Sequence, residues 1–302
     1  MTPYGVPVLD VSAFAATRSD PTFVTDLEQA LTAYGFVGLV GHNVTEALVQ
    51  SCEDAARDLF ALPDEVKAQF ETPKDGRQRG YTGMGVERAK DASVADLKEF
   101  WHVGRDGVPT LPENRFPDAV PALAPAARAL FDRLDALSLL VLQAIALGLD
   151  LPSAYFTDRV QGGNNVLRLI HYPPVGSKAP PGAVRAAAHE DINLITLLPV
   201  AAEPGLELRT RDGTWVPIRP PPGAIVLDTG DMMQLVTNGR LPATTHRVVN
   251  PPSATADRPR YSMPFFVHPK PQVRLDRIDG SATGPTAEAF LTKRLRETGV
   301  AS

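Results

Sequence analysis

A histidine and an aspartate stand two positions apart in AAAHEDINLITLLPV, a stretch at residues 186–200 whose apolar run is typical of a buried strand. Alternate side chains of a strand point to one face, so we expect His189 and Asp191 to face the same way and Glu190 to face the opposite way. A carboxylate on an apolar strand is costly to bury unless a cation compensates it. The pair indicates a metal site, with a simple histidine-carboxylate hydrogen bond as the alternative.

A second histidine, His246, begins the β-rich run THRVVN further along the chain. Two imidazoles and one carboxylate on one face are the ligand set of non-haem Fe(II) oxygenases, which leaves coordination positions open for substrate or oxygen. A structural zinc site, in contrast, is closed by its protein ligands.

An arginine and a serine follow His246 in the stretch RPRYSMPFFV. Arg260 and Ser262 share a strand face by the same alternation. Together they offer a planar guanidinium fork and a hydroxyl, which suit one carboxylate held in a fixed orientation.

The elements that must position these residues differ between the two halves of the chain. In the first half we expect a short strand in PVLDVSAF, a helix over 23–34, a strand in GFVGLVGHN, and helices beginning at Thr45 and at LPDEV. A long buried helix should cover 121–147 and end at Gly148.

From Gln161 onward the chain consists of short β-rich runs separated by proline, glycine and asparagine. The runs are NVLRLIHY, INLITLLPV, GLELRT, AIVLDTGDMMQLV, THRVVN and RYSMPFFV. Their spacing is typical of an antiparallel sandwich or barrel rather than of βαβ units, and it predicts a jelly roll. The tail, 286–297, should form a closing helix.

The order HED, HR and RYS resembles the iron and 2-oxoglutarate-dependent dioxygenases, specifically the isopenicillin N synthase-like branch. The stretches VPVLDVS, AYGFVGLVGHNV, LFALPDEVKAQF and GYTGMGVERAKDASVADLKEFWHVG resemble the N-terminal region of that family, and NVLRLIHYPP through PFFVHP resembles its catalytic part. The resemblance implies a mainly β fold with flanking helices around a double-stranded β-helix, or jelly-roll, core. We expect one compact unit with an N-terminal α/β region at 1–120, a long helix and connection at 121–160, and the jelly-roll region at 161–302.

Residue by residue, the resemblance implies that His189, Asp191 and His246 bind Fe(II). It also implies that Arg260, Ser262 and Tyr172, which lies in LIHYPP, hold the distal carboxylate of 2-oxoglutarate. The cofactors implied are therefore Fe(II), 2-oxoglutarate as cosubstrate, and O2. The reaction implied is oxidation, by default hydroxylation, of an unactivated C–H bond of a small substrate, with release of succinate and CO2. Desaturation and ring closure stay open.

Two further residues are candidates for contact with the substrate. Val166, Arg168, Ile170 and Tyr172 share one strand face, so Arg168 could hold an acidic group of the substrate, with an ion pair at the barrel mouth as the alternative. Phe265 and Phe266 point to opposite faces, and we expect one in the core and Phe266 against the substrate.

Three other functions stay open on the sequence alone. One is a 2-oxoglutarate-independent oxidase or cyclase similar to isopenicillin N synthase, which also carries an RxS motif. The second is a non-catalytic metal-binding jelly-roll protein, since a fold does not determine a function. The third is a zinc hydrolase, which is disfavoured because no carboxylate besides Asp191 is placed as a general base.

Composition limits the partners. The net charge of −5 and the pI near 5.7 give no reason to expect nucleic acid or an anionic membrane, so a small molecule is the expected partner. One cysteine, Cys52, excludes an intrachain disulfide and fits a reducing, cytoplasmic location. The apolar stretch 136–149 is shorter than the ~20 residues that span a bilayer.

Asp228 and Asp231 flank Gly230, which indicates a tight turn. We therefore expect these two aspartates to be turn and strand-end residues that form hydrogen bonds rather than metal ligands.

Overall fold

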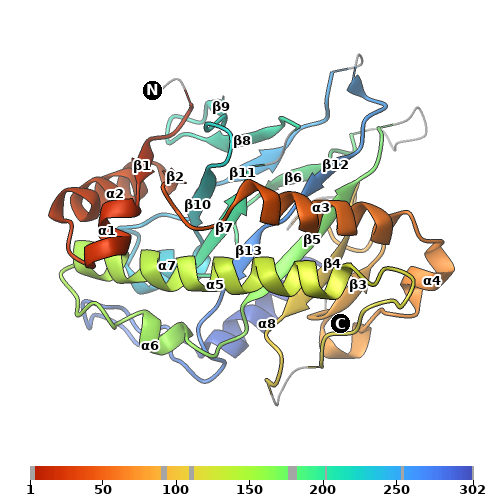
Figure 1. Cartoon of the computed structure of the whole chain (residues 1–302). Coiled ribbons are helices and arrows are strands. Elements are labelled where there is room, and N and C mark those ends of the chain that lie inside the picture. The colour runs from red at the N-terminus through yellow and green to blue at the C-terminus, as the bar shows by residue number, and fades with distance from the viewer. Residues whose placement is uncertain are drawn as a thin grey trace.

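Two β-sheets form the centre of the computed structural model, which describes residues 4–89, 94–108, 112–175, 182–200, 203–252 and 255–300. Helices flank the larger sheet, and the two long helices α3 and α5 run side by side across one of its faces (Figure 1). The expected jelly-roll core with flanking helices is confirmed.

The larger sheet has nine strands in the order β1-β2-β10-β7-β13-β5-β4-β3, and β12 pairs with β5 next to β13. Only β1 and β2 are parallel among the pairs described. The strands are β1 (Val8–Asp10), β2 (Phe36–Val40), β3 (Gly80–Thr82), β4 (Glu99–Gly104), β5 (Val166–Tyr172), β7 (Ile195–Pro199), β10 (Ile225–Thr229), β12 (Arg260–Ser262) and β13 (Phe265–Val267).

The smaller sheet has the order β6-β11-β8-β9. Its strands are β6 (Ala186–His189), β8 (Leu206–Arg209), β9 (Trp215–Pro217) and β11 (His246–Val248). The strands of 1–120 thus extend the larger sheet at both ends of the jelly roll, and the division into three regions remains a prediction.

The helices begin and end where local chemistry dictates. In α2 (Pro21–Tyr34) Asp20 caps the first turn and Gly35 ends the helix with a positive φ, which glycine adopts without strain. In α3 (Glu46–Phe60) the Thr45 hydroxyl accepts the Leu48 N–H at 3.3 Å, as expected of an N-cap. The remaining helices are α1 (Ser12–Thr17), α4 (Asp64–Ala68), α5 (Leu123–Gly148), α6 (Thr157–Val160), α7 (Asp231–Val236) and α8 (Ala287–Glu297).

Three expectations on local structure are wrong in part. The stretch 186–200 is two strands, β6 and β7, that belong to different sheets and are joined by a turn at 190–194. The run DMMQLV forms the helix α7 rather than continuing β10, and Gly230 between the two elements is the N-cap of that helix. RYSMPFFV is likewise divided into β12 and β13 at Met263 and Pro264, since proline cannot donate to a strand ladder.

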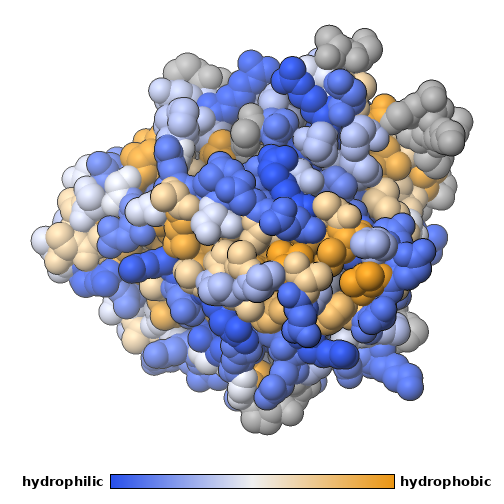
Figure 2. Space-filling model, turned by 45° about the vertical axis from the view of Figure 1, so that its right-hand side comes forward, coloured by the Kyte–Doolittle hydropathy of each residue, from blue (hydrophilic) through white to orange (hydrophobic). Residues whose placement is uncertain are grey.

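The main core lies between α5 and the larger sheet. Fourteen residues of α5 are buried, and the helix contacts α2, α3 and β13. The face shown in Figure 2 is mostly hydrophilic, with apolar side chains gathered in a band across its middle. In the described part of the chain, no helix is long and apolar enough to cross a membrane.

Candidate metal centre and cavity

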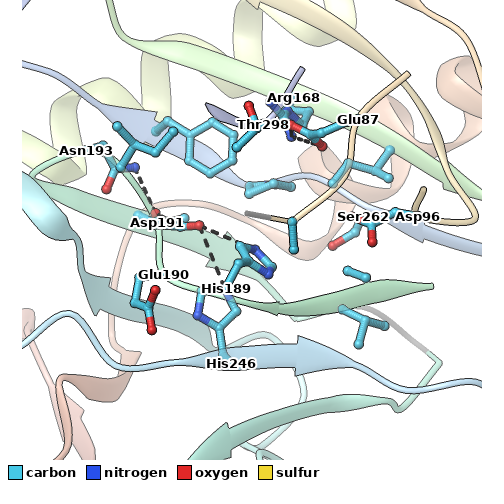
Figure 3. Close-up of a pocket in the computed structure, with 18 of the residues that line it drawn as sticks. Glu87, Asp96, Arg168, His189, Glu190, Asp191, Asn193, His246, Ser262 and Thr298 are labelled. Atoms are coloured by element: carbon cyan, nitrogen blue, oxygen red, sulfur yellow. Dashed lines mark hydrogen bonds and ion pairs between the residues drawn. The ribbon is translucent and has the colours of Figure 1, made fainter. Parts of the chain in front are cut away.

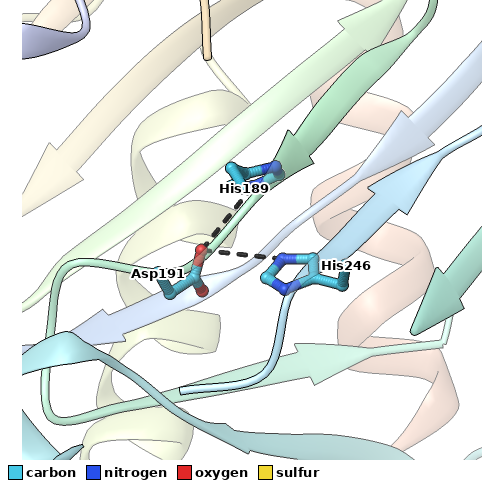
Figure 4. Close-up of side chains that lie close together, drawn as sticks. All are labelled: His189, Asp191 and His246. Carbon is cyan, nitrogen blue, oxygen red and sulfur yellow. Dashed lines mark ion pairs between the residues drawn. The ribbon is translucent and has the colours of Figure 1, made fainter. Parts of the chain in front are cut away.

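Three potential metal ligands meet where β6 and β11 pair. His189 ends β6, His246 begins β11, and the antiparallel register places the two residues opposite each other. Asp191 Oδ1 lies 3.8 Å from His189 Nε2 and 3.7 Å from His246 Nε2 (Figure 4). One ligand atom from each residue lies within 4.8 Å of the other two, close enough to bind a single ion.

The strand alternation does not explain this geometry. β6 ends at His189, so Asp191 lies in the following turn. Glu190, expected to face away, also lines the cavity (Figure 3). It accepts a hydrogen bond from the Thr245 hydroxyl. The turn, together with the pairing of β6 and β11, brings the ligands together.

Both histidines present Nε2 to the centre because Nδ1 is held by the backbone. His189 Nδ1 lies 2.7 Å from the Ala187 carbonyl and His246 Nδ1 lies 3.2 Å from the Thr244 carbonyl, so each Nδ1–H donates and each Nε2 keeps its lone pair. Burial and repulsion from His189 lower the pKa of His246, which keeps that ring neutral. Two imidazoles that present Nε2 and one carboxylate, with coordination positions left open, fit Fe(II).

The carboxylate of Asp191 is oriented by two residues that the sequence analysis missed. The Thr196 hydroxyl on β7 donates to Asp191 Oδ2 and accepts from Asn193 Nδ2 at 2.9 Å. All three side chains are buried. Their signal was the row of polar residues Asp191, Asn193 and Thr196 in an otherwise apolar stretch.

Asp228 is the next-to-last residue of β10, at the strand end as expected. Its side chain is 4% exposed, and its Oδ2 has no hydrogen-bond partner among the described residues, which differs from the expected hydrogen-bonding role. Burial first, and then the neighbouring Asp191, raise the pKa of Asp228 well above its ordinary value. Asp231, in contrast, is at the N-terminal end of α7 and pairs with Arg294 of α8 at 2.7 Å.

The three residues expected to hold a dicarboxylate line the same cavity as the ligands. β12 pairs with β5 so that Arg260 is opposite Tyr172 and Ser262 is opposite Ile170. The guanidinium carbon of Arg260 is 5.2 Å from the centre of the Tyr172 ring. Arg260 is 3% exposed, and its Nη1 is buried without a partner, so the arginine retains a donor for an anion.

The rest of the cavity, whose volume is about 270 Å³, extends along β5. Val166, Arg168, Ile170 and Tyr172 all line it, so the expected shared face is confirmed. Arg168 Nη1 pairs with Glu87 Oε2 at 3.0 Å (Figure 3), which is the ion pair given as the alternative for this residue.

Aromatic and histidine side chains fix the Arg168 guanidinium further. Its carbon lies 4.1 Å from the Phe100 ring centre and 5.1 Å from that of Phe266, and its Nε donates to His102 Nε2 at 2.7 Å. Phe266 lines the cavity, while Phe265 is fully buried in the core, as expected of neighbours on opposite faces.

A chain of buried charges continues from Arg168. Lys98 Nζ lies 2.7 Å from Glu87 Oε2 and 2.8 Å from Asp96 Oδ2, and Asp96 Oδ1 accepts the backbone N–H of Ala187 in β6. Burial raises the pKa of Glu87, but the two cations beside it outweigh burial and hold the pKa well below its usual range. Two positive and two negative side chains therefore balance in this part of the cavity wall.

The family comparisons cover both halves of the chain. Residues 6–124 match the family model described as non-haem dioxygenase in morphine synthesis N-terminal, and residues 163–269 match the 2OG-Fe(II) oxygenase superfamily. A 2-oxoglutarate-Fe(II) type oxidoreductase of Emericella nidulans, hxnY, is 30% identical over 288 residues, which cover 90% of this chain and 81% of the relative.

Solved structures agree over nearly the full length. A 2OG-Fe(II) oxygenase family protein of Caulobacter crescentus has a TM-score of 0.85 and 40% identity and covers 97% of this chain and 98% of its own. A full-length Neurospora crassa protein in complex with alpha-KG and thymine has a TM-score of 0.87 and 28% identity, with 99% of each chain covered.

Proposed function

Because the chain belongs to the 2OG-Fe(II) oxygenase superfamily and is a 2-oxoglutarate- and Fe(II)-dependent dioxygenase, we propose that His189, Asp191 and His246 are its iron ligands. The supporting observation is that their three ligand atoms lie within 4.8 Å of one another beside the cavity. Iron held by these residues would, with 2-oxoglutarate and O2, supply the oxidising power for a C–H bond, and 2-oxoglutarate would leave as succinate and CO2. Hydroxylation is the proposed outcome.

Hydrogen bonds within the protein orient the three proposed ligands before a metal ion binds. The backbone carbonyls that hold each Nδ1 select the tautomer that can coordinate through Nε2, and Thr196 restrains the Asp191 carboxylate.

For the cosubstrate we propose that Arg260, Ser262 and Tyr172 hold the distal carboxylate of 2-oxoglutarate. Two observations support this: the three side chains line the cavity that contains the metal ligands, and Arg260 Nη1 is buried without a partner. A guanidinium and hydroxyls match a carboxylate in charge and in hydrogen-bonding geometry.

For the substrate we propose a small polar molecule that contacts Phe266 and Arg168. The Neurospora crassa protein binds thymine, a small polar ring, and the cavity of about 270 Å³ suits a molecule of that size. A carboxylate on the substrate, the finer expectation, would have to compete with Glu87 for Arg168. A cytoplasmic location also stays a proposal, supported by the single, buried Cys52 and testable by cell fractionation.

Anaerobic titration of the Fe(II) protein with 2-oxoglutarate tests the site. We expect a metal-to-ligand charge-transfer band in the wild type, no band for Asp191→Ala, and a weakened 2-oxoglutarate affinity for Arg260→Met. A normal band in the Asp191 variant would remove the assigned ligand. A panel containing thymine, 5-formyluracil and matched carboxylic acids, with succinate release as the readout, then identifies the substrate class. If a carboxylic acid is the best substrate, a neutral polar substrate is refuted.

A further inference from the structure

Two buried arginines are linked beside the proposed cosubstrate site, because Arg185 donates a hydrogen bond to the carbonyl of Arg258, two residues before Arg260. Arg260, which lines the cavity, is 3% exposed, and Arg185, which is not among the lining residues, is 1% exposed. Arg185 immediately precedes β6 and Arg260 begins β12, so the two come from different sheets. The sequence analysis did not single out Arg185.

Carboxylates attract both arginines without contacting them: Glu203 acts on both guanidiniums, and Glu53 acts on Arg260. Arg185 Nη2 donates to the Arg258 carbonyl at 2.8 Å, and Arg260 Nε donates to the Glu203 carbonyl at 3.3 Å. Among the described residues, neither guanidinium forms an ion pair with a carboxylate. Arg185 Nε and Arg260 Nη1 are both buried without a hydrogen-bond partner.

The two guanidiniums repel each other. Burial, and next the charge of Arg260, lower the pKa of Arg185, and burial lowers the pKa of Arg260. Buried like charges that no carboxylate contacts are unfavourable, since the surroundings replace little of the water that they lose. Elsewhere in this cavity wall, Arg168 and Lys98 each contact a carboxylate, so a pair of buried arginines with only distant counter-charges is a distinct feature.

Arg185 is held in its place by neighbouring residues. Its backbone N–H donates to Asn250 Oδ1 at 3.0 Å, and Asn250 Nδ2 donates to the Ala183 carbonyl at 2.9 Å. The next residue, Ala186, packs in one apolar cluster with Tyr172, which is opposite Arg260 in the strand register. Arg185 is therefore fixed next to the anion-binding side chains and not free to turn to solvent.

We infer that Arg185 supplies a second positive charge for the distal carboxylate of 2-oxoglutarate and acts as a positioning residue that directs Arg260 into the cavity. It makes no contact with the cosubstrate in this role. Charges interact strongly over several ångströms in a poorly solvated interior, so contact is not needed. The consequence is selectivity for a dicarboxylic 2-oxo acid. The inference rests on the proposed role of Arg260.

The test compares two 2-oxo acids that differ only at the distal end. 2-Oxoglutarate and 2-oxovalerate, which has a methyl group in place of the distal carboxylate, are titrated calorimetrically without O2 into protein loaded with Mn(II). Arg185→Gln removes the charge and retains a donor for the Arg258 carbonyl. We expect it to weaken 2-oxoglutarate binding about tenfold while changing 2-oxovalerate binding little.

Two further variants separate charge from structure. Arg185→Lys restores the charge and should recover most of the preference for 2-oxoglutarate. Arg79→Met, at another buried arginine that is 1% exposed, controls for the loss of a buried guanidinium and should leave the preference unchanged. In steady-state assays the glutamine variant should raise KM for 2-oxoglutarate with little change in kcat.

The outcomes distinguish the inference from the proposed function. Equal weakening of both acids by Arg185→Gln, or no weakening, overturns the inference. If Arg260→Met leaves 2-oxoglutarate affinity unchanged, the proposed cosubstrate site itself is wrong. If the glutamine variant does not fold, Asn250→Asp is tested instead, because it keeps the acceptor for the Arg185 N–H and adds a negative charge beside Arg185. This variant must lower the preference for 2-oxoglutarate over 2-oxovalerate. An unchanged preference overturns the inference.

Discussion

Replacing Thr196 by valine isolates the hydrogen bond that orients the Asp191 carboxylate. The two side chains have nearly the same shape, so the change removes the hydroxyl that donates to Asp191 Oδ2 and accepts from Asn193. Thr196 is 2% exposed, and no bulk water can replace the lost donor without rearrangement. Metal binding must then order a carboxylate that the wild-type protein already restrains.

The expected loss of metal affinity follows from the negative charge of the acceptor, the Asp191 carboxylate. A hydrogen bond to a charged group contributes about 1.5–3 kcal/mol, and about 1.4 kcal/mol corresponds to a factor of ten in affinity. We therefore expect the variant to bind metal roughly 10- to 100-fold more weakly, the range typical of partners that orient metal ligands. Competition of Co(II) between the protein and a chromophoric chelator measures this affinity directly.

Thr82 provides the matched control. It is fully buried, and its hydroxyl has no hydrogen-bond partner, so Thr82→Val removes a hydroxyl without removing a hydrogen bond. We expect unchanged metal affinity and equal or higher stability, measured by chemical denaturation. If Thr196→Val bound Co(II) as tightly as the wild type, or if both variants lost affinity equally, the assigned role of Thr196 would be refuted.

Three other predictions concern residues around the site. Phe265→Ala should lower the free energy of unfolding by about 3–5 kcal/mol, because the ring is fully buried and its centre lies 5.0 Å from that of the Phe131 ring. Phe266→Ala, at a residue that lines the cavity, should mainly raise KM for the substrate. Similar losses of stability in the two variants would contradict this assignment. Burial raises the pKa of Cys52 to about 12, so the native thiol should resist iodoacetamide at pH 8 while the unfolded chain reacts; fast native labelling would count against it. Burial lowers the pKa of His268 to about 4 from its ordinary 6.5, so the unfolded chain binds a proton between these values and the native protein does not. The contribution of His268 to stability is therefore fully present above pH 6.5 and is lost as the pH falls toward 4. Between pH 7.5 and 5.0 the free energy of unfolding of the metal-free wild type should fall by about 2 kcal/mol more than that of His268→Gln. Equal decreases for the two proteins in chemical denaturation would show that His268 is not the cause.

Much of the fold is predictable because its signals are local. The capping hydroxyl of Thr45 acts on its own first turn, and the apolar spacing of 121–147 and the glycine after it define a long helix without reference to other elements. The bounds and partners of the strands are harder to predict from the sequence, since a strand pairs with segments that are distant along the chain. DMMQLV has a strand-like composition yet forms a helix after Gly230.

For the site, residue types and their order indicated iron and a dicarboxylate, because few side chains coordinate that metal or match that anion. His189, Asp191, His246 and Arg260 were identified in this way, Tyr172 was identified from the family resemblance, and all five line one cavity. The alternation argument for His189 and Asp191 was nevertheless wrong in detail, because β6 ends between them.

Tertiary structure alone decided how these groups are held and balanced. Asp191 is oriented by a threonine on the next strand, and Arg168 is paired with Glu87 from a distant segment. Arg185, which precedes a strand of the smaller sheet, is hydrogen-bonded to the Arg258 carbonyl just before β12 of the larger sheet. Hydrogen bonds and charge interactions depend on distances in space, which strand pairing and the intervening turns determine. The sequence therefore determined which chemistry the chain can perform, and the fold determined which charges are compensated and which are left for a ligand.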